Sequence, residues 1–560
     1  MIWRYRLALA LVLLAFAGII LRLFYWQVVK AQDLSILGQA QYEKAFVVSP
    51  QRGEIRTSDN FPIATDKISY LLFANPKLIK EKENVSILLS SALGIEKSSV
   101  SAQLSMDKFW VPIKKGLDSG EKEKVEMLKI PGLGFDKTYT RLYPEASMAA
   151  HLLGFVGKDD LGKNKGYFGL EGYYDRLLRG KDGTGVELSD ALGGPILQGT
   201  DPSTGDLRGR SLVLNIDRTI QFIVEKKLKA SIERFGAAGG MVGVMDPKTG
   251  KILAISAFPS FSPLDYGKFE EKEYKNPFIS NLYEPGSTLK PLIMSAAFDA
   301  NLVTPQTRCN MCGGPVSIGG YEIKTWNDKY RKDLNMAETI QYSDNTGMIF
   351  VGKKLGIDRM TDYLDKFGIG KNTGIDLQGE VSQPVPDKEF WYEVDVATRA
   401  FGQGISITPI ELLDAFSSIA NKGIRMEPQV VASVETEDGK LLKINPKILG
   451  RTISAQSAKV MTEILVNAVN KGEASWARVK GYRIAGKTGT ASIPIKGHYD
   501  PNKTIASFIG FAPADDPKFA MLVIFDKPTT SIYGSETAAP VFFDIAKNIL
   551  AYYGIAPSGE

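Results

Sequence analysis

A serine and a lysine three residues apart are the residues of this chain best suited to covalent chemistry. Ser287 and Lys290 lie in residues 284–291, a Pro-Gly turn that runs into an apolar, helix-like segment. If Ser287 opens that helix, Lys290 lies one turn further along the same face, with its amine beside the hydroxyl. A lysine can take the proton of a serine nucleophile when burial or a second cation depresses its pKa. The pattern alone is weak, because a capping serine followed by a solvated lysine has the same spacing.

Two further stretches strengthen the hypothesis of a serine nucleophile. Ser343-Asp344-Asn345 follows a helix-like segment at residues 336–341. Lys-Thr-Gly-Thr at residues 487–490 follows residues 482–486, which have the composition of a strand. A serine with a lysine one turn on, then Ser-Asp-Asn, then Lys-Thr-Gly is the order found in a group of serine acyl-transfer enzymes. Each motif is weak alone, but chance is a poor explanation for all three in this order.

The elements around these motifs predict an antiparallel sheet covered by helices. Residues 240–257 show two apolar strands joined by a polar turn, which is typical of a β-hairpin. Helix-like segments then dominate to about residue 420, strand signals return at residues 507–512 and 519–525, and a helix is expected near residues 540–553. Strands at both ends with helices between them indicate an α+β domain. That arrangement would bring the Lys-Thr-Gly strand beside the helix of Ser287.

An apolar run near the start of the chain predicts a membrane anchor. Residues 7–21 carry no charge, and Arg4 and Arg6 precede them. About 20 apolar helical residues span a bilayer core, and cations before them hold the N-terminus in the cytoplasm. A cleaved signal peptide is the alternative, because residues 15–17 (Ala-Phe-Ala) resemble a cleavage site, but the apolar run continues past them. We therefore expect a single-pass protein of the cytoplasmic (inner) membrane with its catalytic part outside the cytoplasm.

Composition indicates an ordinary globular chain of several folding units. It has 560 residues, too many for one typical domain, with 44% hydrophobic and 23% charged. The net charge of +5 is too small to indicate a nucleic-acid partner. Residues 45–230 alternate short apolar runs with turns and charged stretches, and no His, Cys and carboxylate cluster there is spaced for chemistry. This region is predicted to support the catalytic part.

Taken together, the motifs resemble those of class B penicillin-binding proteins, membrane-anchored D,D-transpeptidases that cross-link peptidoglycan. The matching stretches are residues 283–291, 343–345, 401–409, 487–491 and 507–510 in the catalytic part, and 52–55, 141–144 and 169–171 before it. Within the class, Glu284-Pro285 and residues 22–28 and 152–157 resemble the septal, division-type enzymes more than the elongation type.

The resemblance implies an α+β architecture in three parts. Residues 1–30 would be the cytoplasmic tip and transmembrane anchor. Residues 31–232 would be an elongated, mixed α/β, non-catalytic pedestal of the dimerisation type. Residues 233–560 would be the transpeptidase, or penicillin-binding, domain.

The first two motifs would supply the nucleophile and its proton path. By the resemblance, Ser287 attacks the D-Ala–D-Ala carbonyl of a donor stem peptide and holds the remainder as an acyl-enzyme, while Lys290 takes its proton. Ser343 relays a proton to the leaving amine. Asn345 holds Lys290 and a substrate amide. Because β-lactams imitate the donor's end, they should acylate Ser287.

The third motif would bind the substrate. Lys487 supplies a second cation that keeps Lys290 deprotonated, and together with Thr488, Gly489 and Thr490 it suits the substrate's carboxylate. Backbone N–H groups of Ser287 and Thr490 would form the oxyanion hole. A neighbouring stem peptide supplies the acceptor amine.

The resemblance also implies partners. The segment before the catalytic part lacks the motif of a glycosyltransferase, so glycan polymerisation would need a SEDS-family glycosyltransferase (FtsW-like) that contacts the anchor and pedestal, together with divisome proteins. No cofactor and no metal are implied.

Asp344 keeps a second function open. Class B enzymes often carry serine there, and Ser-Asp-Asn is also the form of class A β-lactamases. Such a lactamase needs a further carboxylate to activate water, and no clear Glu-x-x-Leu-Asn stretch lies between residues 345 and 487. A β-lactam sensor would need a cytoplasmic signalling domain, for which only the residues before Leu7 remain. Intact Ser287 and Lys290 argue against an inactive divisome scaffold.

The cysteines and the first histidine fall outside these motifs. Cys309 and Cys312 form a C-x-x-C pair that favours a small disulfide ring outside the membrane, although the sequence does not decide whether they are bonded. Zinc would need two further ligands. His151, within an apolar stretch, is predicted to be buried and hydrogen-bonded rather than catalytic.

Overall fold

The chain folds into two compact units in the computed structural model, and each unit combines separate stretches of sequence. The first unit comprises Met1–Arg52, Asp66–Thr140 and Gly180–Gly209, and the second comprises Gly53–Thr65, Arg141–Arg179 and Arg210–Glu560. The structure describes residues 2–35, 43–48, 50–145, 148–160, 162–181, 183–189, 195–197, 208–436, 438–495 and 498–557. The three-part division expected from the sequence stays a prediction.

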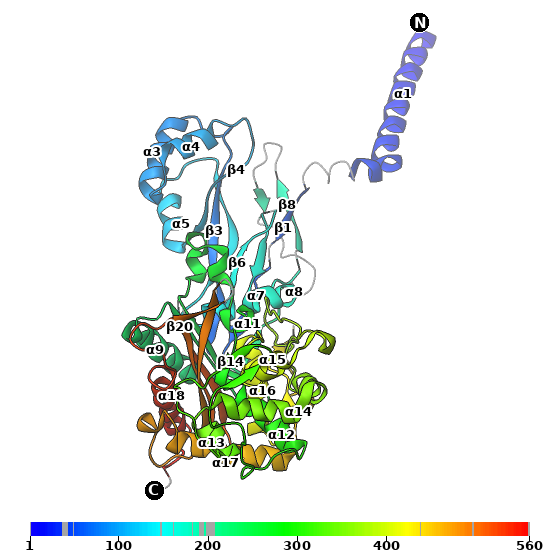
Figure 1. Cartoon of the computed structure of the whole chain (residues 1–560). Coiled ribbons are helices and arrows are strands. Elements are labelled where there is room, and N and C mark those ends of the chain that lie inside the picture. Colours follow the sequence, from blue (N-terminus) through cyan, green and yellow to red (C-terminus); the bar gives the residue numbers. More distant parts are fainter. Residues whose placement is uncertain are drawn as a thin grey trace. The chain divides into compact units, whose positions relative to one another are not determined.

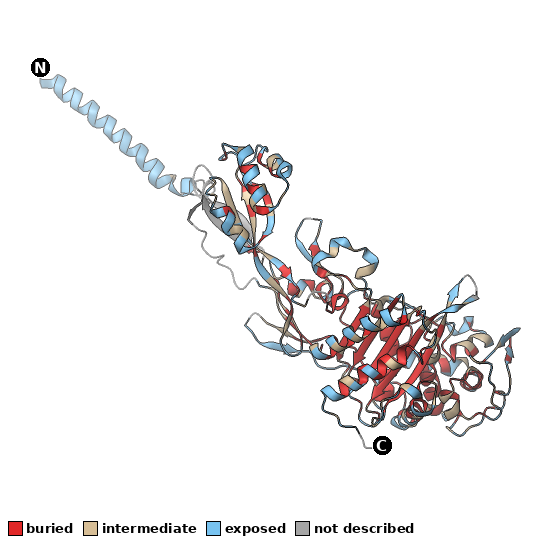
Figure 2. Ribbon diagram, turned by 90° about the vertical axis from the view of Figure 1, so that its left-hand side faces the viewer, coloured by how far each residue is buried: buried red, intermediate tan, exposed pale blue. Residues whose placement is uncertain are grey.

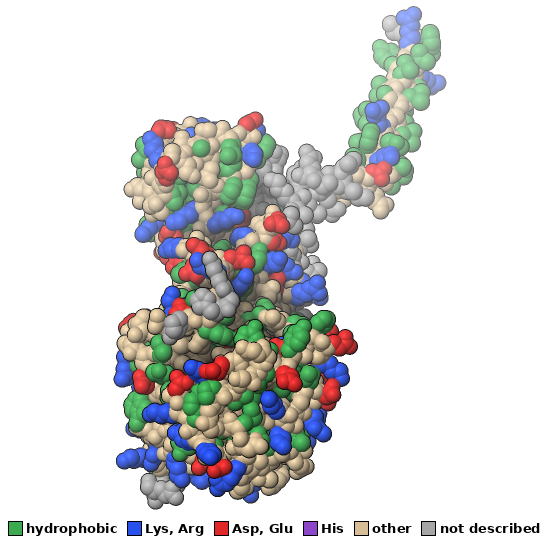
Figure 3. Space-filling model, in the orientation of Figure 1, with side chains coloured by type: hydrophobic (Ala, Val, Ile, Leu, Met, Phe, Trp, Pro, Cys, Tyr) green, Lys and Arg blue, Asp and Glu red, His purple; other side chains and the backbone are tan. Residues whose placement is uncertain are grey.

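The first unit begins with a long apolar helix. It consists of α1 (Ile2–Phe24) and a π-helical turn, η1 (Tyr25–Val29). Its most apolar window has a mean hydropathy of 2.6, so Ile2–Val29 is long and apolar enough to cross a membrane. Hydrophobic side chains cover most of α1 in Figure 3. This is the helix predicted at residues 7–21.

The rest of the first unit has a small core of its own. Its helices are α3 (Lys82–Leu93), α4 (Lys97–Leu104) and α5 (Ser119–Glu126), and they accompany β4 (Val111–Leu117), β5 (Leu133–Leu142) and the part of β3 (Pro62–Ala74) after Asp66. Leu72, Leu89 and Leu104 are fully buried in this core. A three-stranded antiparallel sheet joins β1 (Glu43–Val48), β8 (Gly183–Ser189) and β9 (Pro195–Leu197).

A five-stranded antiparallel sheet forms the centre of the second unit. Its strand order is β12-β11-β21-β20-β19. The strands are β11 (Gly239–Met245), β12 (Ile252–Phe258), β19 (Ala485–Ile495), β20 (His498–Ala512) and β21 (Phe519–Asp526). The predicted hairpin at residues 240–257 and the two C-terminal strands are confirmed. One boundary differs, because the strand begins at Ala485 and not at residue 482; it runs through the Lys-Thr-Gly motif.

Helices cover both faces of this sheet, and the alternation of side chains in β21 shows why. Met521, Val523 and Phe525 share a core with α9 (Arg218–Phe235) and α18 (Ala538–Tyr552). Leu522 and Ile524 point to the other core, which is shared with the helices between residues 290 and 471. Figure 1 shows α9 and α18 on one side of the strands and α12, α14 and α16 on the other, and Figure 2 shows the sheet buried between them. The expected α+β class is confirmed.

The other elements of the second unit surround this core. The helices are α6 (Ala150–Leu153), α7 (Gly169–Tyr173), α8 (Asp175–Leu178), η2 (Pro263–Lys268), α10 (Glu271–Tyr274), α11 (Pro277–Ser280), η3 (Gly286–Thr288), α12 (Lys290–Asp299), α13 (Met336–Gln341), α14 (Asn345–Lys366), η4 (Lys388–Phe390), α15 (Glu393–Arg399), α16 (Pro409–Ala420), α17 (Ala455–Lys471) and η5 (Ser475–Ala477). The strands are β2 (Ile55–Arg56), β6 (Phe155–Lys158), β7 (Asn164–Tyr167), β10 (Leu212–Leu214), β13 (Val316–Ile318), β14 (Tyr321–Ile323), β15 (Ile424–Met426), β16 (Val431–Glu435), β17 (Leu441–Lys443) and β18 (Ile448–Arg451).

His151, Cys309 and Cys312, which lie outside the three motifs, have structural roles. His151 is buried, its Nε2 lies 3.0 Å from the carbonyl oxygen of Glu273, and its ring packs edge-on against Phe261. Burial lowers the pKa of His151 to about 4, so the imidazole is neutral at pH 7 and the prediction is confirmed. Cys309 and Cys312 form a disulfide, and both are buried in the loop between α12 and β13.

Candidate active site

Ser287 lies on a single helical turn that feeds directly into α12. Pro285 precedes the turn η3 (Gly286–Thr288), and Lys290 is the first residue of α12. From the sequence, Ser287 could open this helix; in the structure, Ser287 lies in the turn before the helix, and α12 itself starts at Lys290. Lys290 is fully buried, whereas Ser287 is only half-buried. The serine hydroxyl therefore lies nearer the surface and the lysine amine inside the domain.

The turn that carries Ser287 is held by the Phe401–Thr408 stretch that the sequence singled out. Gly286 donates its backbone N–H to the carbonyl of Gly402 over 3.0 Å. Gly402 has φ of +85°, and a Cβ there would lie 2.1 Å from the carbonyl oxygen of Gly286. Only glycine fits such a conformation and approach. A second hydrogen bond holds the turn, because the carboxylate of Glu284 accepts the N–H of Gly404 over 3.0 Å.

The second motif forms the turn between α13 and α14. Asp344 is the N-cap of α14, and its carboxylate accepts the N–H of Gly347 over 2.9 Å. The cap fixes the turn in which Ser343 has φ of +55°, a conformation uncommon for serine. Asp344 is therefore a structural residue of the turn, a role that sequence reasoning missed although an N-cap aspartate before a helix was readable.

The third motif lies on β19, the edge strand of the sheet. Lys487 and Thr488 are buried, and Thr490 is half-buried with its Oγ1 accepting the N–H of Gly534 over 3.0 Å. A Cβ on Gly489 would lie 2.3 Å from Ser507 Oγ, so the motif's glycine permits close packing. An edge strand leaves backbone groups on its outer side available to another chain.

Hydrogen bonds join the three motifs into one network centred on Ser343. Its hydroxyl donates to Ser287 Oγ over 3.0 Å and accepts from Lys487 Nζ over 2.9 Å and from Lys290 Nζ over 3.3 Å. Lys290 Nζ also donates to the Ser343 carbonyl over 2.6 Å and to Asn345 Oδ1 over 2.8 Å. All five residues predicted to be catalytic are therefore in one connected cluster.

The network differs from the expected one at its central step. Within the described residues, no hydrogen bond joins Ser287 Oγ directly to Lys290 Nζ. Ser343 lies between them and contacts both. A proton that leaves Ser287 for Lys290 along these contacts passes through the Ser343 hydroxyl.

Electrostatics give the two lysines different charge states near neutral pH. Burial, and next the Lys487 ammonium, lower the pKa of Lys290 from 10.5 to about 7, against the carboxylates of Asp344 and Glu473. Burial lowers the pKa of Lys487 to about 8, against Glu473. At pH 7 about half of Lys290 is then neutral, whereas an unshifted lysine is neutral in roughly one molecule in three thousand. Of the two lysines, Lys290 is therefore the one that loses its proton more readily.

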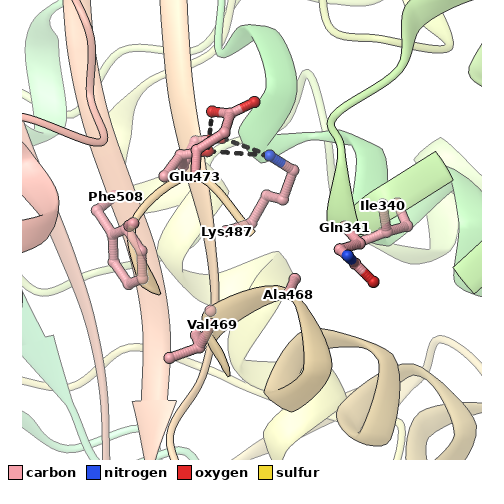
Figure 4. A pocket seen from close by; sticks show the side chains of 10 residues that line it. Ile340, Gln341, Ala468, Val469, Glu473, Lys487 and Phe508 are labelled. Carbon is pink, nitrogen blue, oxygen red and sulfur yellow. Dashed lines mark hydrogen bonds between the residues drawn. The ribbon is translucent and has the colours of Figure 1, made fainter. Parts of the chain in front are cut away.

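Glu473 is a residue of this site that the sequence did not reveal. It follows the C-terminus of α17, and its Oε2 lies 3.4 Å from Thr488 Oγ1, which in turn accepts from Lys487 Nζ over 3.1 Å. Figure 4 shows Glu473 and Lys487 at the same cavity. Nothing in its local sequence, Lys471-Gly472-Glu473, distinguishes this carboxylate from a solvated one.

Comparison with known protein families gives two matches that together cover most of the chain. The family described as "Penicillin binding protein transpeptidase domain" matches residues 240–550. The family described as "Penicillin-binding Protein dimerisation domain" matches residues 47–214. All five network residues fall inside the first match.

Similar proteins match over nearly their whole length. The chain is 32% identical to stage V sporulation protein D of Bacillus subtilis, over 96% of this chain and 83% of that protein. It is 29% identical to peptidoglycan D,D-transpeptidase FtsI of Escherichia coli K12, over 99% of this chain and 92% of that protein.

Solved structures of two penicillin-binding proteins superpose on most of this chain. Penicillin binding protein 2X from Streptococcus thermophilus superposes with a TM-score of 0.78 at 25% identity, over 92% of this chain and 81% of that one. Penicillin binding protein 3 from Mycobacterium tuberculosis, complexed with aztreonam, has a TM-score of 0.71 at 26% identity, over 92% and 98% of the two chains.

Proposed function

Because the chain belongs to the class B penicillin-binding proteins, we propose that it is a peptidoglycan D,D-transpeptidase that works through an acyl-enzyme on Ser287. The observation that carries the proposal is the contact chain from Ser287 through Ser343 to Lys290, with Lys487 on the same hydroxyl. It gives a half-exposed nucleophile a buried base and a buried cation. A neutral lysine beside a charged one is what serine activation at neutral pH requires.

The three oxygens around Lys290 suit it to act as a base. The carbonyl of Ser343 and Oδ1 of Asn345 can only accept hydrogen bonds, and both are close, at 2.6 and 2.8 Å. Neutral Lys290 therefore keeps two N–H donors on these oxygens and turns its lone pair toward the Ser343 hydroxyl. That hydroxyl can donate to Lys290 while it accepts from Ser287 and Lys487.

Acylation follows from this arrangement. Ser287 Oγ attacks the carbonyl between the two terminal D-Ala residues, its proton moves to Ser343, and the proton of Ser343 moves to Lys290. When the tetrahedral intermediate collapses, the C–N bond breaks and the leaving D-Ala amine takes a proton back along the same path. Ser343 is the proton relay in both directions. An acceptor amine then attacks the acyl-enzyme, and Ser287 leaves with a proton.

Substrate binding is assigned to β19 and its neighbours. A stem peptide adds to the outer side of this edge strand through backbone hydrogen bonds, with its terminal carboxylate near Thr488 and Thr490. The carboxylate bonds to the Thr490 hydroxyl, because the Thr488 hydroxyl already donates to Glu473. Lys487 supplies positive charge from behind, because its ammonium is turned inward to Ser343 and Thr488. The backbone N–H groups of Ser287 and Thr490 are proposed as the oxyanion hole, and Asn345 as a contact for a substrate amide.

An exchange assay tests the proposal. The full chain in detergent is incubated with a synthetic stem peptide that ends in D-Ala–D-Ala and with a fluorescent D-amino acid as acceptor. We expect the terminal D-Ala to be replaced by the label, and Ser287→Ala to give no product. Release of D-Ala with hydrolysed peptide alone, whatever the acceptor concentration, would instead support a hydrolase.

The biological setting is proposed as septal wall synthesis. Glu284-Pro285 and residues 22–28 and 152–157 resemble the division-type enzymes. Elongation is the alternative. The relative named for stage V sporulation gives a sporulation role specific support as a second candidate. Depletion of the protein in growing cells distinguishes the three roles. Filamentous cells would indicate a role in septation, and rounded cells a role in elongation. Normal growth with defective spores would indicate a role in sporulation.

The proposal extends to membrane topology and partners. Residues 1–30 anchor the chain with its N-terminus in the cytoplasm, residues 31–232 form the pedestal, and residues 233–560 act outside the membrane. The apolar helix Ile2–Val29 and the arginines before residue 7 support this orientation. A SEDS-family glycosyltransferase of the FtsW type and divisome proteins are the proposed partners, and β-lactams the proposed inhibitors.

A further inference from the structure

A small cavity lies beside Lys487, inside the second unit. It is lined by residues of α13 and α17, by the loop after α17 and by β19, and among them are Gln341, Ala468, Glu473 and Lys487. The space it offers to solvent is about 10 Å³, which accommodates about one water molecule. Figure 4 shows Glu473 and Lys487 at one end of this cavity, with hydrogen bonds drawn between them and the strand.

The hydrogen bonds and the helix end around the Glu473 carboxylate give it little stabilisation, so a purely structural role does not explain its position. Its Oε1 is buried without a hydrogen-bond partner in the part of the chain that the structure describes, and its Oε2 has only the long contact to Thr488 Oγ1 at 3.4 Å. It also follows the C-terminal end of α17, where the helix dipole disfavours a negative charge. Local hydrogen bonding therefore does not account for a carboxylate here, whereas a neighbouring cation does.

That cation is Lys487. The ammonium of Lys487 donates to Ser343 Oγ, to the Thr488 carbonyl and to Thr488 Oγ1, so Thr488 Oγ1 stands between Lys487 and Glu473. The charged groups that face the lysine pair are Glu473 on the side of Lys487 and Asp344 on the side of Lys290. Both carboxylates act on Lys290, whereas Glu473 is the one that acts on Lys487.

We propose that Glu473 is a positioning residue for the acyl-transfer reaction: through Thr488, and through one water in the cavity, its carboxylate keeps Lys487 protonated and directed at Ser343. The assignment rests on the proposed transpeptidase function. With Lys487 held as the cation, the proton of Ser287 has a single destination, Lys290. Without Glu473, Lys487 loses its proton at lower pH, the second cation disappears, and both activation and carboxylate binding weaken.

The direction in which pH changes the acylation rate follows from the charge state that each of the two lysines must have. Activity requires Lys290 neutral and Lys487 charged, so acylation rises through the pKa of Lys290 near 7 and falls through that of Lys487 near 8. Glu473 raises both pKa values, and among the described residues it is the charged group that opposes the burial of Lys487. Removing the charge therefore moves the alkaline limb to lower pH by about one unit. At pH 8.5 the rate falls by about tenfold, and at pH 6, where Lys487 stays protonated, it does not fall.

The test is the rate of acylation by a fluorescent penicillin from pH 5.5 to 9, with the full chain in detergent. Glu473→Gln removes the charge and keeps the shape, and it is expected to shift the alkaline limb downward. Glu473→Asp retains a carboxylate and should restore the limb toward that of the wild type. Glu463→Gln is the matched control, because Glu463 lies on α17 but pairs with exposed Arg483, and its profile should match the wild type.

The outcomes separate this inference from the proposed function. A wild-type adduct together with a Glu473→Gln profile that is uniformly lowered, or unchanged, overturns the positioning role alone. If Glu473→Gln does not fold by circular dichroism, Thr488→Val provides the second variant, because it breaks the link at Thr488 and is expected to shift the same limb. An unshifted limb in that variant also overturns the inference. Absence of any wild-type adduct overturns the proposed function itself.

Discussion

Replacing Lys290 by methionine is expected to slow acylation of Ser287 by a β-lactam by about 10³ to 10⁴. Methionine fills a similar volume but has no lone pair to receive the proton that Ser343 delivers. The Ser343 carbonyl and Asn345 Oδ1 also lose their donor. The measurement is the second-order acylation rate at pH 7.5, taken from the appearance of fluorescent adduct with time.

An arginine at the same position distinguishes a base from a fixed positive charge. Lys290→Arg keeps the charge but cannot deprotonate, so it is expected to be as slow as the methionine variant. Lys353→Met, at an exposed position on α14, is the control and should acylate like the wild type. If folded Lys290→Arg retained wild-type acylation, Lys290 would not be the base.

The wild-type pH profile gives an independent check on Lys290. Its pKa of about 7 means that the neutral form disappears tenfold per pH unit below that value. The acylation rate is therefore expected to fall with the same slope between pH 6.5 and 5. A rate that stayed flat over this range would contradict a base with that pKa.

Replacing Ser343 by alanine is expected to reduce acylation by about 10² to 10³. The contacts of this network run through the Ser343 hydroxyl, which touches Ser287 Oγ and both lysine ammonium groups. Removing it leaves Ser287 without its path to Lys290, unless a water enters the gap. The loss should appear in the acylation step at every pH, because no titrating group is removed.

A matched control separates this relay from packing. Ser295→Ala changes a buried serine of α12 whose hydroxyl, within the described residues, bonds only to the carbonyl of Leu292. This variant is expected to acylate at the wild-type rate and to melt within a few degrees of the wild type. Ser343→Ala with wild-type acylation would show instead that the proton of Ser287 reaches Lys290 without the relay.

The three motifs could be predicted from the sequence because their chemistry is local. A serine and a lysine three residues apart share a helix face whatever the rest of the chain does, and Lys487 sits in a strand whose apolar pattern is readable. The hairpin at residues 240–257 and the two C-terminal strands were predictable for the same reason. The sheet then brings β19 against the turn of Ser287.

The features that could not be predicted from the sequence depend on contacts between residues far apart along the chain. The place of Ser343 between Ser287 and Lys290 depends on the turn between α13 and α14, 53 residues from Lys290. The position of Glu473 beside Thr488 depends on the packing of α17 against β19. The membership of Gly53–Thr65 and Arg141–Arg179 in the second unit depends on contacts with segments far along the chain.

The most direct test of an acyl-enzyme on Ser287 is the intact mass of the full chain after labelling with a fluorescent penicillin, followed over hours and located by peptide mapping. We predict the addition of one drug molecule on the peptide that carries Ser287, persistence of the adduct, and no adduct in Ser287→Ala. Rapid loss of the adduct with accumulation of hydrolysed drug, or a label that survives Ser287→Ala, would contradict the account.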